Sequence, residues 1–572
     1  MAKPQANMKS ENSRVQISLP FFNMLRSYHR HWLKNDIAAG LSACIVMIPS
    51  VIAYAELVHL PPIAGLYAAL AASIGYALFA SSRHVIAGPD AAIGLLAGTA
   101  ILPLALGDPS RMAMLAAELG LLSGVVLLLA ARLNLGVIAD LLSRPVLVGY
   151  LNGASLVLIA TQLGKLFAIK SEGEDFFPLL FNLINKMSDA HWPTMVFGAL
   201  LILLLLAIVR WLPKLPGALA VSAVAILATY LFNLGELGIA LVGEVPSGIP
   251  SMEVFVPRWS DISALAPAAV AIAFLTFSDG VLLAQTFAEK HNYQVDPNQE
   301  LVALGSANIL ASMWQGFPVS ASQSRTSIVD ATGGHSQVAQ MVAAAGLLLF
   351  LVFLTGLIAL LPKVALGAIL IMAAIGMLEF ASLRNLYKVD RNEFSIAIAV
   401  MSAILIAGVV TGIIAGLLLS LIAVLVEISR PRDAVLKRLI KDGKFHDCLE
   451  EDEAEDVPGV IVYRLYAPLI FANARYVVKR IRELVEQTSN VKWLIIDAQA
   501  ITDMDVTAAQ RFAELHREML GQGVEIKIAD APRPFREELA KVGLSEALGS
   551  QQFFVSVKKA VEAFEQQQSP SF

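Results

Sequence analysis

The chain has 572 residues, of which 56% are hydrophobic and 16% are charged, and its formal net charge is −5. Soluble proteins carry about 25% charged residues, so most of this chain cannot be an ordinary soluble domain. The small negative charge argues against a nucleic-acid partner, and two cysteines, Cys44 and Cys448, exclude a disulfide framework or a cysteine-based zinc site.

Residues 1–36 are polar and are expected to form an N-terminal tail. Basic residues gather just before the first apolar run, among them Arg26, Arg30 and Lys34. The stretch lacks the small-residue cleavage site of a signal peptide, so we expect it to be retained on the cytoplasmic side.

Residues 37–429 form the predicted transmembrane domain, because a helix that crosses the bilayer needs about 20 apolar residues. Such runs lie at 37–57, 62–80, 111–131, 137–160, 191–211, 215–234, 265–288, 298–314, 335–360, 364–379 and 394–428. The last would be about 52 Å long as one helix, so we expect a break at Gly408, Gly412 or Gly416 and count two spans. Two shorter segments that begin near residues 88 and 319 bring the number of predicted spans to fourteen.

The fourteen spans divide into a first repeat, residues 37–234, and a second repeat, residues 265–429. If the two repeats share a fold, an odd number of spans inserts them in opposite orientations, which is an inverted repeat. Most basic residues between spans then lie on the cytoplasmic side together with both termini; Lys165, Lys170 and Lys186 are exceptions. The sequence therefore predicts a multi-pass protein of the inner (plasma) membrane.

The C-terminal part has the composition of a soluble protein. Residues 430–458 are predicted to be a linker with an acidic run, Asp447–Asp456, and residues 459–566 a small domain. Strand-like segments at 459–466, 491–497 and 524–530 alternate with helical patterns that follow them. This alternation is typical of an open α/β domain, which we expect to be cytoplasmic.

Two broken segments stand out in the apolar block. Gly88-Pro89-Asp90-Ala91-Ala92 and the stretch from Gly316 to Arg325 each introduce glycine, proline and polar groups, about fifty residues after the start of their own half. Paired interruptions of this kind are the best sequence indication of a transporter's substrate site. The sequence therefore favours a secondary transporter.

Arg325 is the first candidate for substrate binding. An arginine among membrane spans is costly, and this one follows a glycine-proline break, in the first turn of a half-helix where backbone N–H groups favour an anion. Ser320, Ser322, Gln323 and Ser324 add further donors. These groups predict a site for an oxyanion. The alternatives are an arginine that reaches the membrane interface or one that pairs with Asp330.

The counterpart in the first half is formed by Pro89, Asp90, Ala91 and Ala92. Proline suits the first position of a helix, and two half-helix N-termini would then face one cavity. Asp90 has three possible roles: it caps its own helix, accepts a proton, or helps to exclude the wrong anion.

Asp279 lies in the middle of an apolar span and is the candidate site for a coupling ion. A proton, Na⁺ or a cationic partner such as Arg325 would have to neutralise its charge. Na⁺ at Asp279 is the one metal expected, because the nine histidines form no ligand pair at helical spacing beyond His29 and His31. Glu289, Lys290 and Glu300 are expected in a solvated loop.

Enzyme motifs are missing from the sequence. There is no phosphate-binding loop and no nucleophile elbow, so neither a catalytic activity nor a cofactor is expected.

Several motifs resemble those of SulP-type anion permeases, the sulfate permease family. In the first half these are Ile48-Pro49, Ala53-Tyr54-Ala55, Leu60-Pro61-Pro62, Gly65-Leu66-Tyr67-Ala68-Ala69, Ser81-Ser82-Arg83-His84 and Gly88-Pro89. In the second half they are Asn298-Gln299-Glu300-Leu301, Ala307-Asn308-Ile309 and Ser320 to Arg325. The C-terminal domain resembles a STAS domain at Leu494-Ile495-Ile496-Asp497 and Asp503-Met504-Asp505.

This resemblance implies a fourteen-span, uracil-permease-like fold with a core domain and a gate domain. The anion would lie between the N-termini of the third and tenth spans, at Gly88–Ala92 and Ser322–Arg325, with Asp279 of the eighth span beside it. It also implies a homodimer and a STAS domain that binds a cytoplasmic regulator or supports assembly.

The leading hypothesis is a transporter of sulfate, bicarbonate or a C4-dicarboxylate, coupled to H⁺ or Na⁺ and working by alternating access. Anion exchange and uniport remain open. A nucleobase permease is a further alternative, although it does not account for Arg325. In the last alternative, the membrane part only anchors or senses and the STAS-like domain signals.

Overall fold

The computed structural model describes residues 19–568 except 137–142, 170–175, 213–214, 250, 253–256, 442, 448–453, 542, 544–545 and 547–548. The chain forms two compact units that divide between Ser420 and Leu421, within α17 (Val409–Ser429). Each unit has its own hydrophobic core.

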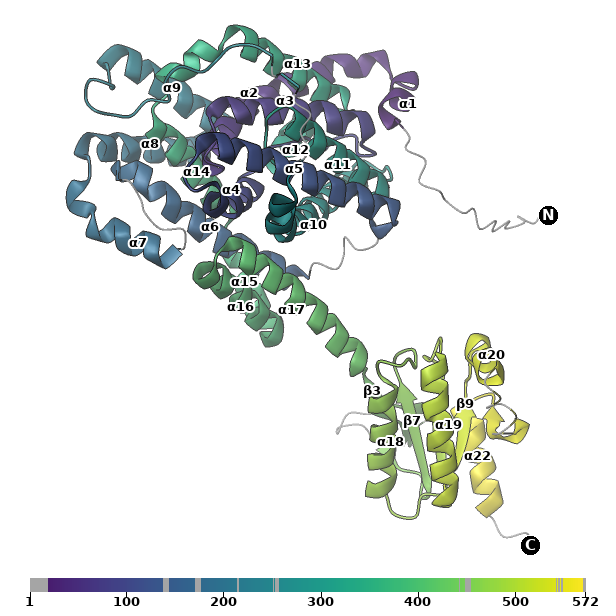
Figure 1. Cartoon of the computed structure of the whole chain (residues 1–572). Coiled ribbons are helices and arrows are strands. Elements are labelled where there is room, and N and C mark those ends of the chain that lie inside the picture. Colours follow the sequence, from purple (N-terminus) through teal and green to yellow (C-terminus); the bar gives the residue numbers. More distant parts are fainter. Residues whose placement is uncertain are drawn as a thin grey trace. The chain divides into compact units, whose positions relative to one another are not determined.

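The first unit is helical apart from one pair of two-residue strands, β1 (Ala87–Gly88) and β2 (Ser320–Ala321) (Figure 1). Its first half contains α1 (Pro20–Arg26), η1 (Arg30–Trp32), α2 (Leu33–Leu57), α3 (Pro62–Phe79), α4 (Ala91–Ala105), α5 (Pro109–Arg132), α6 (Arg144–Phe167), α7 (Phe176–Asn185), η3 (Met187–Asp189), α8 (Trp192–Trp211) and α9 (Gly217–Phe232). Its second half contains α10 (Trp259–Lys290), α11 (Pro297–Met313), α12 (Gln323–Ala331), α13 (Val338–Phe353), η4 (Thr355–Leu360), α14 (Lys363–Met377), α15 (Phe380–Val389), α16 (Arg391–Ala407) and α17.

Each predicted span corresponds to a helix, although some boundaries differ. Eight helical stretches in the described residues are long and apolar enough to cross a bilayer, and α4, α9 and α13 are shorter apolar helices. The span predicted at 137–160 begins in residues that the structure leaves undescribed, and α6 starts at Arg144 because Pro145 stands in its first turn. The expected break in the last apolar run is at Gly408, whose φ of 85° ends α16.

Besides α1, which lies in the segment expected to be a tail, two helices of this unit, α7 and α15, were not predicted. Each has ten residues, too few to cross a bilayer, and buries only two leucines along one face: Leu179 and Leu183 in α7, Leu383 and Leu386 in α15. Each follows the fifth helix of its half, counted from α2 in the first half and from α10 in the second, so the two halves share even this minor element.

Packing within the first unit separates the helices into two groups. α2, α3, α4 and α5 pack with α10, α11, α12 and α13, whereas α6, α8 and α9 pack mainly with each other, with α14 and, through α6, with α16. In the first group, helices approach closely at small residues: a Cβ on Gly124 of α5 would lie 2.8 Å from the carbonyl oxygen of Gly305 in α11. Small residues permit this close packing of membrane helices.

The second unit is an α/β domain. Its sheet has the order β10-β9-β8-β7-β3, with β3 (Asp433–Val435), β7 (Val460–Leu465), β8 (Trp493–Asp497), β9 (Glu525–Ala529) and β10 (Phe553–Phe554). β7, β8, β9 and β10 are parallel, in the register Val462 to Ile495 to Lys527, and β3 is antiparallel to β7. A small sheet of order β5-β4-β6 is formed by β4 (Lys437–Leu439), β5 (Phe445–His446) and β6 (Ala454–Glu455).

Alternation along the strands covers both faces of the main sheet. Ile461 and Tyr463 of β7 pack against α18 (Ala474–Gln487), α19 (Val506–Gly521) and α20 (Arg533–Lys541), whereas Val460 and Val462 pack against α22 (Val557–Gln568). The three predicted strands and three predicted helices of this domain are all present. β3 extends the sheet into the segment predicted to be a linker.

Candidate functional site

The two broken segments pair with each other. β1 (Ala87–Gly88) and β2 (Ser320–Ala321) form a two-residue antiparallel ladder in which Ala87 is opposite Ala321 and Gly88 is opposite Ser320. Next to the ladder, the backbone N–H of Ser322 donates to the carbonyl of Ile86 at 2.9 Å. Backbone groups inside a membrane protein must be satisfied internally, and these two segments, from opposite halves of the chain, satisfy one another.

Polar side chains complete this backbone pairing. The amide of Asn308 both donates to the carbonyl of Val319 at 2.9 Å and accepts from its N–H at 3.0 Å. Nε2 of Gln340 donates to the carbonyl of Ala87 at 3.1 Å, and the N–H of Ile86 donates to Oγ1 of Thr326 at 3.1 Å. Sequence reasoning did not single out Gln340 or Thr326, and it named Asn308 only as part of the motif Ala307-Asn308-Ile309.

Two short helices start from the strand pair, and their N-termini differ. Asp90 is the N-cap of α4, and its Oδ1 accepts from the N–H of Ala92 at 3.0 Å. Ser322 is the N-cap of α12 but makes no side-chain capping bond, and its hydroxyl lies 3.4 Å from that of Ser324. One N-terminus is therefore capped by a carboxylate, while the first turn of α12 keeps N–H groups that no side chain caps.

Arg325 lies in the first turn of α12 and is only 2% exposed. Its Nη2 donates to the carbonyl oxygen of Pro89 at 2.9 Å, whereas Nε has no hydrogen-bond partner among the described residues. The alternative pairing with Asp330 does not occur, because that carboxylate is bound to Lys290 and His291 at 2.6 Å each. The guanidinium is thus buried at the junction of both broken segments with a donor left over.

Gly88 makes room for this arginine. A Cβ added to Gly88 would lie 3.2 Å from Nη2 of Arg325, closer than ordinary van der Waals contact. The glycine of the first broken segment therefore allows the side chain from the second segment to approach its backbone.

Asp279 lies on α10, beside the strand pair. The next residue, Gly280, faces Ala321 of β2, since a Cβ on Gly280 would be 3.6 Å from the Cβ of Ala321. Asp279 is half-buried and, within the described part of the chain, makes no ion pair with Arg325 or another cation. It interacts electrostatically with Asp90, which interacts in turn with Arg325.

The remaining predicted residues surround this junction. Ala91 and Ala92 are buried in the first turn of α4, where the carbonyl of Ala92 accepts from the hydroxyl of Tyr150 at 3.2 Å. Gln323 and Ser324 are exposed in the first turn of α12. The structure therefore brings both sets of predicted residues to one place.

The expectation for Glu300 was wrong. Its side chain is fully buried and accepts hydrogen bonds from the N–H and hydroxyl of Ser81, the N–H of Ser82 and the hydroxyl of Tyr76. Glu300 lies in the first turn of α11 and ties that helix to the turn that follows α3. It thereby supports the start of the segment that leads to β1.

Comparison with known proteins decides the family. The model of the sulfate permease family matches residues 33–400, and that of the STAS domain matches residues 453–560. The chain belongs to the sulfate permease family. It is therefore a multi-pass membrane transporter of an anion-transporting family and not an enzyme.

Relatives match over almost their whole length. A protein of Mycobacterium tuberculosis named "Probable sulfate transporter MT1781" is 38% identical, with 94% of this chain and 96% of that protein covered. "Probable sulfate transporter 3.3" of Arabidopsis thaliana is 26% identical, with 96% and 90% covered.

Solved structures show the same fold. The murine anion transporter Slc26a9 in its inward-facing state has a TM-score of 0.88 at 21% identity, with 98% of this chain and 97% of that chain covered. The transmembrane domain of the cyanobacterial bicarbonate transporter BicA has a TM-score of 0.60 at 20% identity, with 69% and 98% covered.

Proposed function

We propose that this protein is a secondary active transporter of a small oxyanion, which binds between the N-termini of α4 and α12. The observation that carries this proposal is Arg325: a buried guanidinium, held by the carbonyl of Pro89 at 2.9 Å, whose Nε has no partner in the described residues. A buried charge without an ion-pair partner is costly. An anion at the uncapped first turn of α12 would supply the missing charge and acceptors.

Each predicted residue has a role in this proposal. The N–H groups of Gln323 and Ser324 and the hydroxyls of Ser322 and Ser324 donate to the anion from the α12 side. Pro89, Ala91 and Ala92 form the wall on the α4 side. The carboxylate of Asp90 already caps α4, so it repels a second negative group and limits how far the anion can extend toward α4.

Sulfate, bicarbonate and a C4-dicarboxylate are the candidate substrates. All three are oxyanions that an arginine and a helix N-terminus can bind. The names of the relatives, which describe sulfate transporters at up to 38% identity, favour sulfate.

Coupling to H⁺ or Na⁺ is proposed to depend on Asp279. Its carboxylate is half-buried beside the strand pair and interacts with Asp90 instead of a cation. A proton or Na⁺ at Asp279 would neutralise one of two neighbouring negative charges and so favour entry of the anion. Anion exchange or uniport is the alternative, in which Asp279 remains without a transported cation.

The two packing groups support alternating access as the transport mechanism. The helices that carry the site, α4, α10 and α12, belong to the group that we interpret as the core domain, and α6, α8, α9, α14 and α16 belong to the group that we interpret as the gate domain. The matching order of helices in the two halves, including α7 and α15, supports an inverted repeat. Movement of one group against the other would expose the site to each side in turn.

The location and assembly of the protein are part of the proposal. We expect it in the inner (plasma) membrane with both termini in the cytoplasm, as the basic residues indicate. A homodimer is expected, with the STAS domain supporting assembly or binding a cytoplasmic regulator.

Uptake by proteoliposomes tests the proposal. Labelled sulfate, bicarbonate and fumarate are supplied to vesicles containing the full chain, under imposed H⁺ or Na⁺ gradients, beside Arg325→Ala. Accumulation of one anion driven by one gradient and lost in the variant is the expected result. If folded protein moves none of the three under any gradient, the proposal is wrong.

A sensing or scaffolding function is the second candidate. The observation in its favour is that the C-terminal domain has a hydrophobic core of its own. A chain that ends at Pro431 keeps all of α17 and omits every strand of that domain. Anion flux through this truncated chain would show that transport is intrinsic to the membrane domain. Inhibition by nucleobases in place of oxyanions would instead favour a nucleobase permease.

A further inference from the structure

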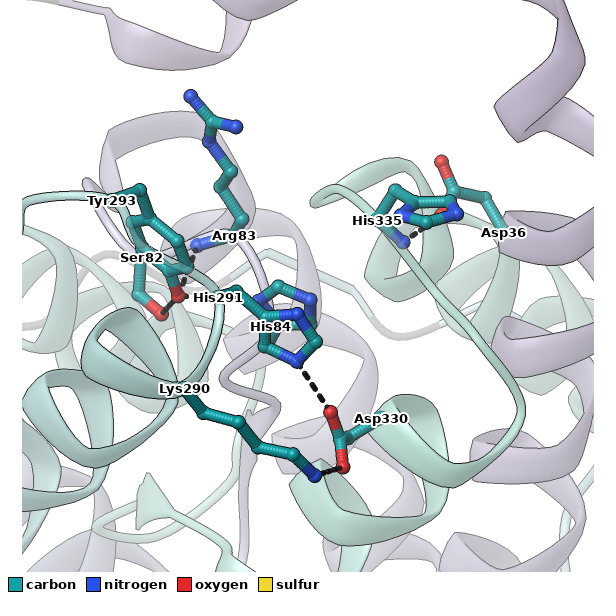
Figure 2. Close-up of polar contacts among 9 residues, drawn as sticks. All are labelled: Asp36, Ser82, Arg83, His84, Lys290, His291, Tyr293, Asp330 and His335. Atoms are coloured by element: carbon teal, nitrogen blue, oxygen red, sulfur yellow. Dashed lines mark hydrogen bonds and ion pairs between the residues drawn. The ribbon is translucent and has the colours of Figure 1, made fainter.

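Three side chains that could bind a metal ion meet on the opposite end of α12 from the anion site. They are His84, in the segment between α3 and β1, His291, at the C-terminus of α10, and Asp330, near the C-terminus of α12 (Figure 2). One potential ligand atom from each lies within 4.8 Å of the other two. Their separation along the chain explains why no spacing motif revealed them.

The carboxylate of Asp330 is already bound to two side chains, one from Lys290 and one from His291. Its Oδ1 is 2.6 Å from Nε2 of His291, and its Oδ2 is 2.6 Å from Nζ of Lys290. The rings of His84 and His291 stack, with centroids 4.2 Å apart and planes 14° apart. The cluster is therefore compact, with one buried and one partly exposed imidazole.

His84 carries the strongest indication of a ligand. The residue is 3% exposed, and its Nδ1 lies 3.2 Å from the hydroxyl of Tyr293. Its Nε2 is buried and has no partner at standard hydrogen-bond geometry among the described residues, although the backbone of Gly334 makes a weaker hydrogen-bonding contact with the ring. A buried polar atom without a partner is unfavourable.

We propose that His84, His291 and Asp330 bind one divalent transition-metal ion of the zinc class, through Nε2 of each histidine and one carboxylate oxygen. Two imidazoles and a carboxylate are a ligand set suited to such ions, with water at the remaining position. The required tautomer of His84 has Nδ1–H donating to the hydroxyl oxygen of Tyr293, which is the second-sphere arrangement usual for metal-bound histidine.

Binding requires one rearrangement. A metal–nitrogen bond lies near the plane of the imidazole ring, so two stacked rings cannot both point Nε2 at the same ion. His291 is exposed at the end of α10, where it can rotate, whereas His84 is buried. The ion would therefore take the place of the hydrogen bond between His291 and Asp330 and separate the two rings.

The proposed metal site connects the elements that form the anion site. α10 carries Asp279, the segment after His84 leads to β1, and α12 begins next to Arg325. Asp330 is five residues after Arg325, about 7.5 Å along the helix axis. Bound metal would hold these three elements together without contacting the anion, so this inference does not depend on the identity of the substrate.

Metal titration of the full-length protein tests the inference. Chelator-treated protein is titrated with Zn²⁺ and with Co²⁺, with bound metal measured after dialysis and the visible spectrum of the cobalt form recorded. We expect one ion per chain, a spectrum of low-coordinate cobalt, and a higher melting temperature with Zn²⁺. His84→Ala and His291→Ala should each weaken binding at least tenfold and abolish the spectrum.

Two controls on the same face sharpen the result. The His335→Ala variant should bind the metal ion normally, because the ring of His335 stacks on Trp32, outside the cluster. Lys290→Ala should bind at least as tightly, because it removes an ammonium that competes for Asp330. If the variant of the buried residue, His84→Ala, fails to fold, His291→Ala alone is enough to test the proposal. No stoichiometric binding, or binding that persists in His291→Ala, would overturn the proposal.

Discussion

Nζ of Lys165 lies 2.6 Å from Oε2 of Glu56, and this ion pair connects α6 to α2. The two helices belong to different packing groups, which the proposed mechanism moves relative to each other. The side chains of Lys165 and Glu56 are only 29% and 13% exposed, so this ion pair is less screened by solvent than a pair on the surface. It stabilises the present arrangement of the two groups.

We predict that breaking this pair changes conformational exchange. Glu56→Gln and Lys165→Met should each alter the rate of anion flux, and the charge-swapped double variant Glu56→Lys/Lys165→Glu should restore it. In a double-mutant cycle on unfolding, the coupling should be about 0.5–3 kcal/mol. Strictly additive effects on both flux and stability would rule out the pair as a connection between the groups.

Gly88→Ala should weaken anion binding, because the new Cβ would lie 3.2 Å from Nη2 of Arg325 and displace the guanidinium. We expect about a tenfold rise in Kd, or about 1.4 kcal/mol, and a larger effect for Gly88→Val. Gly94→Ala is the matched control: its Cβ would meet Tyr54 at 3.5 Å, an ordinary contact. Equal effects at both positions would argue against a specific role for Gly88.

Asp279→Asn should abolish accumulation driven by a cation gradient while downhill anion flux continues, because the neutral amide mimics the cation-bound state. The measurement is uptake into proteoliposomes over a range of pH and Na⁺ concentration. Asp261→Asn on the same helix is the control, since that carboxylate is paired with Arg111 at 2.6 Å. Unchanged pH and Na⁺ dependence in Asp279→Asn would refute the proposed coupling.

Glu300→Gln should destabilise the membrane domain by about 3 kcal/mol, because it replaces a buried carboxylate that accepts hydrogen bonds from Tyr76, Ser81 and Ser82. The amide would turn its NH₂ group toward at least one of these donors. Thermal unfolding in detergent measures the change. Glu289→Gln, at an exposed position, should have little effect, and equal stability of the two variants would contradict this account.

Much of the fold could be predicted from the sequence because membrane spans and sheet strands leave local patterns. The length of apolar runs located the helices, and the conformational freedom of glycine limited the predicted break to Gly408, Gly412 or Gly416, of which Gly408 is the residue with the positive φ. α7 and α15 were missed because ten residues are too few to give the pattern of a membrane span, although α7 is itself apolar. β1 and β2 are too short to have a pattern of their own.

The candidate site was predictable only in its local parts. Arg325, Asp90 and Asp279 stand out because ionisable groups are rare in apolar segments. The bond from Arg325 to Pro89, the burial of Glu300 and the cluster of His84, His291 and Asp330 depend on residues far apart in the chain. No spacing or composition rule reports such contacts.

During synthesis, β1 and α4 leave the ribosome long before β2 exists, since Pro89 and Arg325 are 236 residues apart. Until β2 is inserted, the backbone of Ala87 and Gly88 has no ladder partner, and unpaired backbone groups are strongly disfavoured in hydrocarbon. The first half is therefore inserted into the membrane but incompletely folded until the second half has been synthesised. Closure of the strand pair is then a late step of biogenesis, and a chain released before residue 320 would be inserted without being folded.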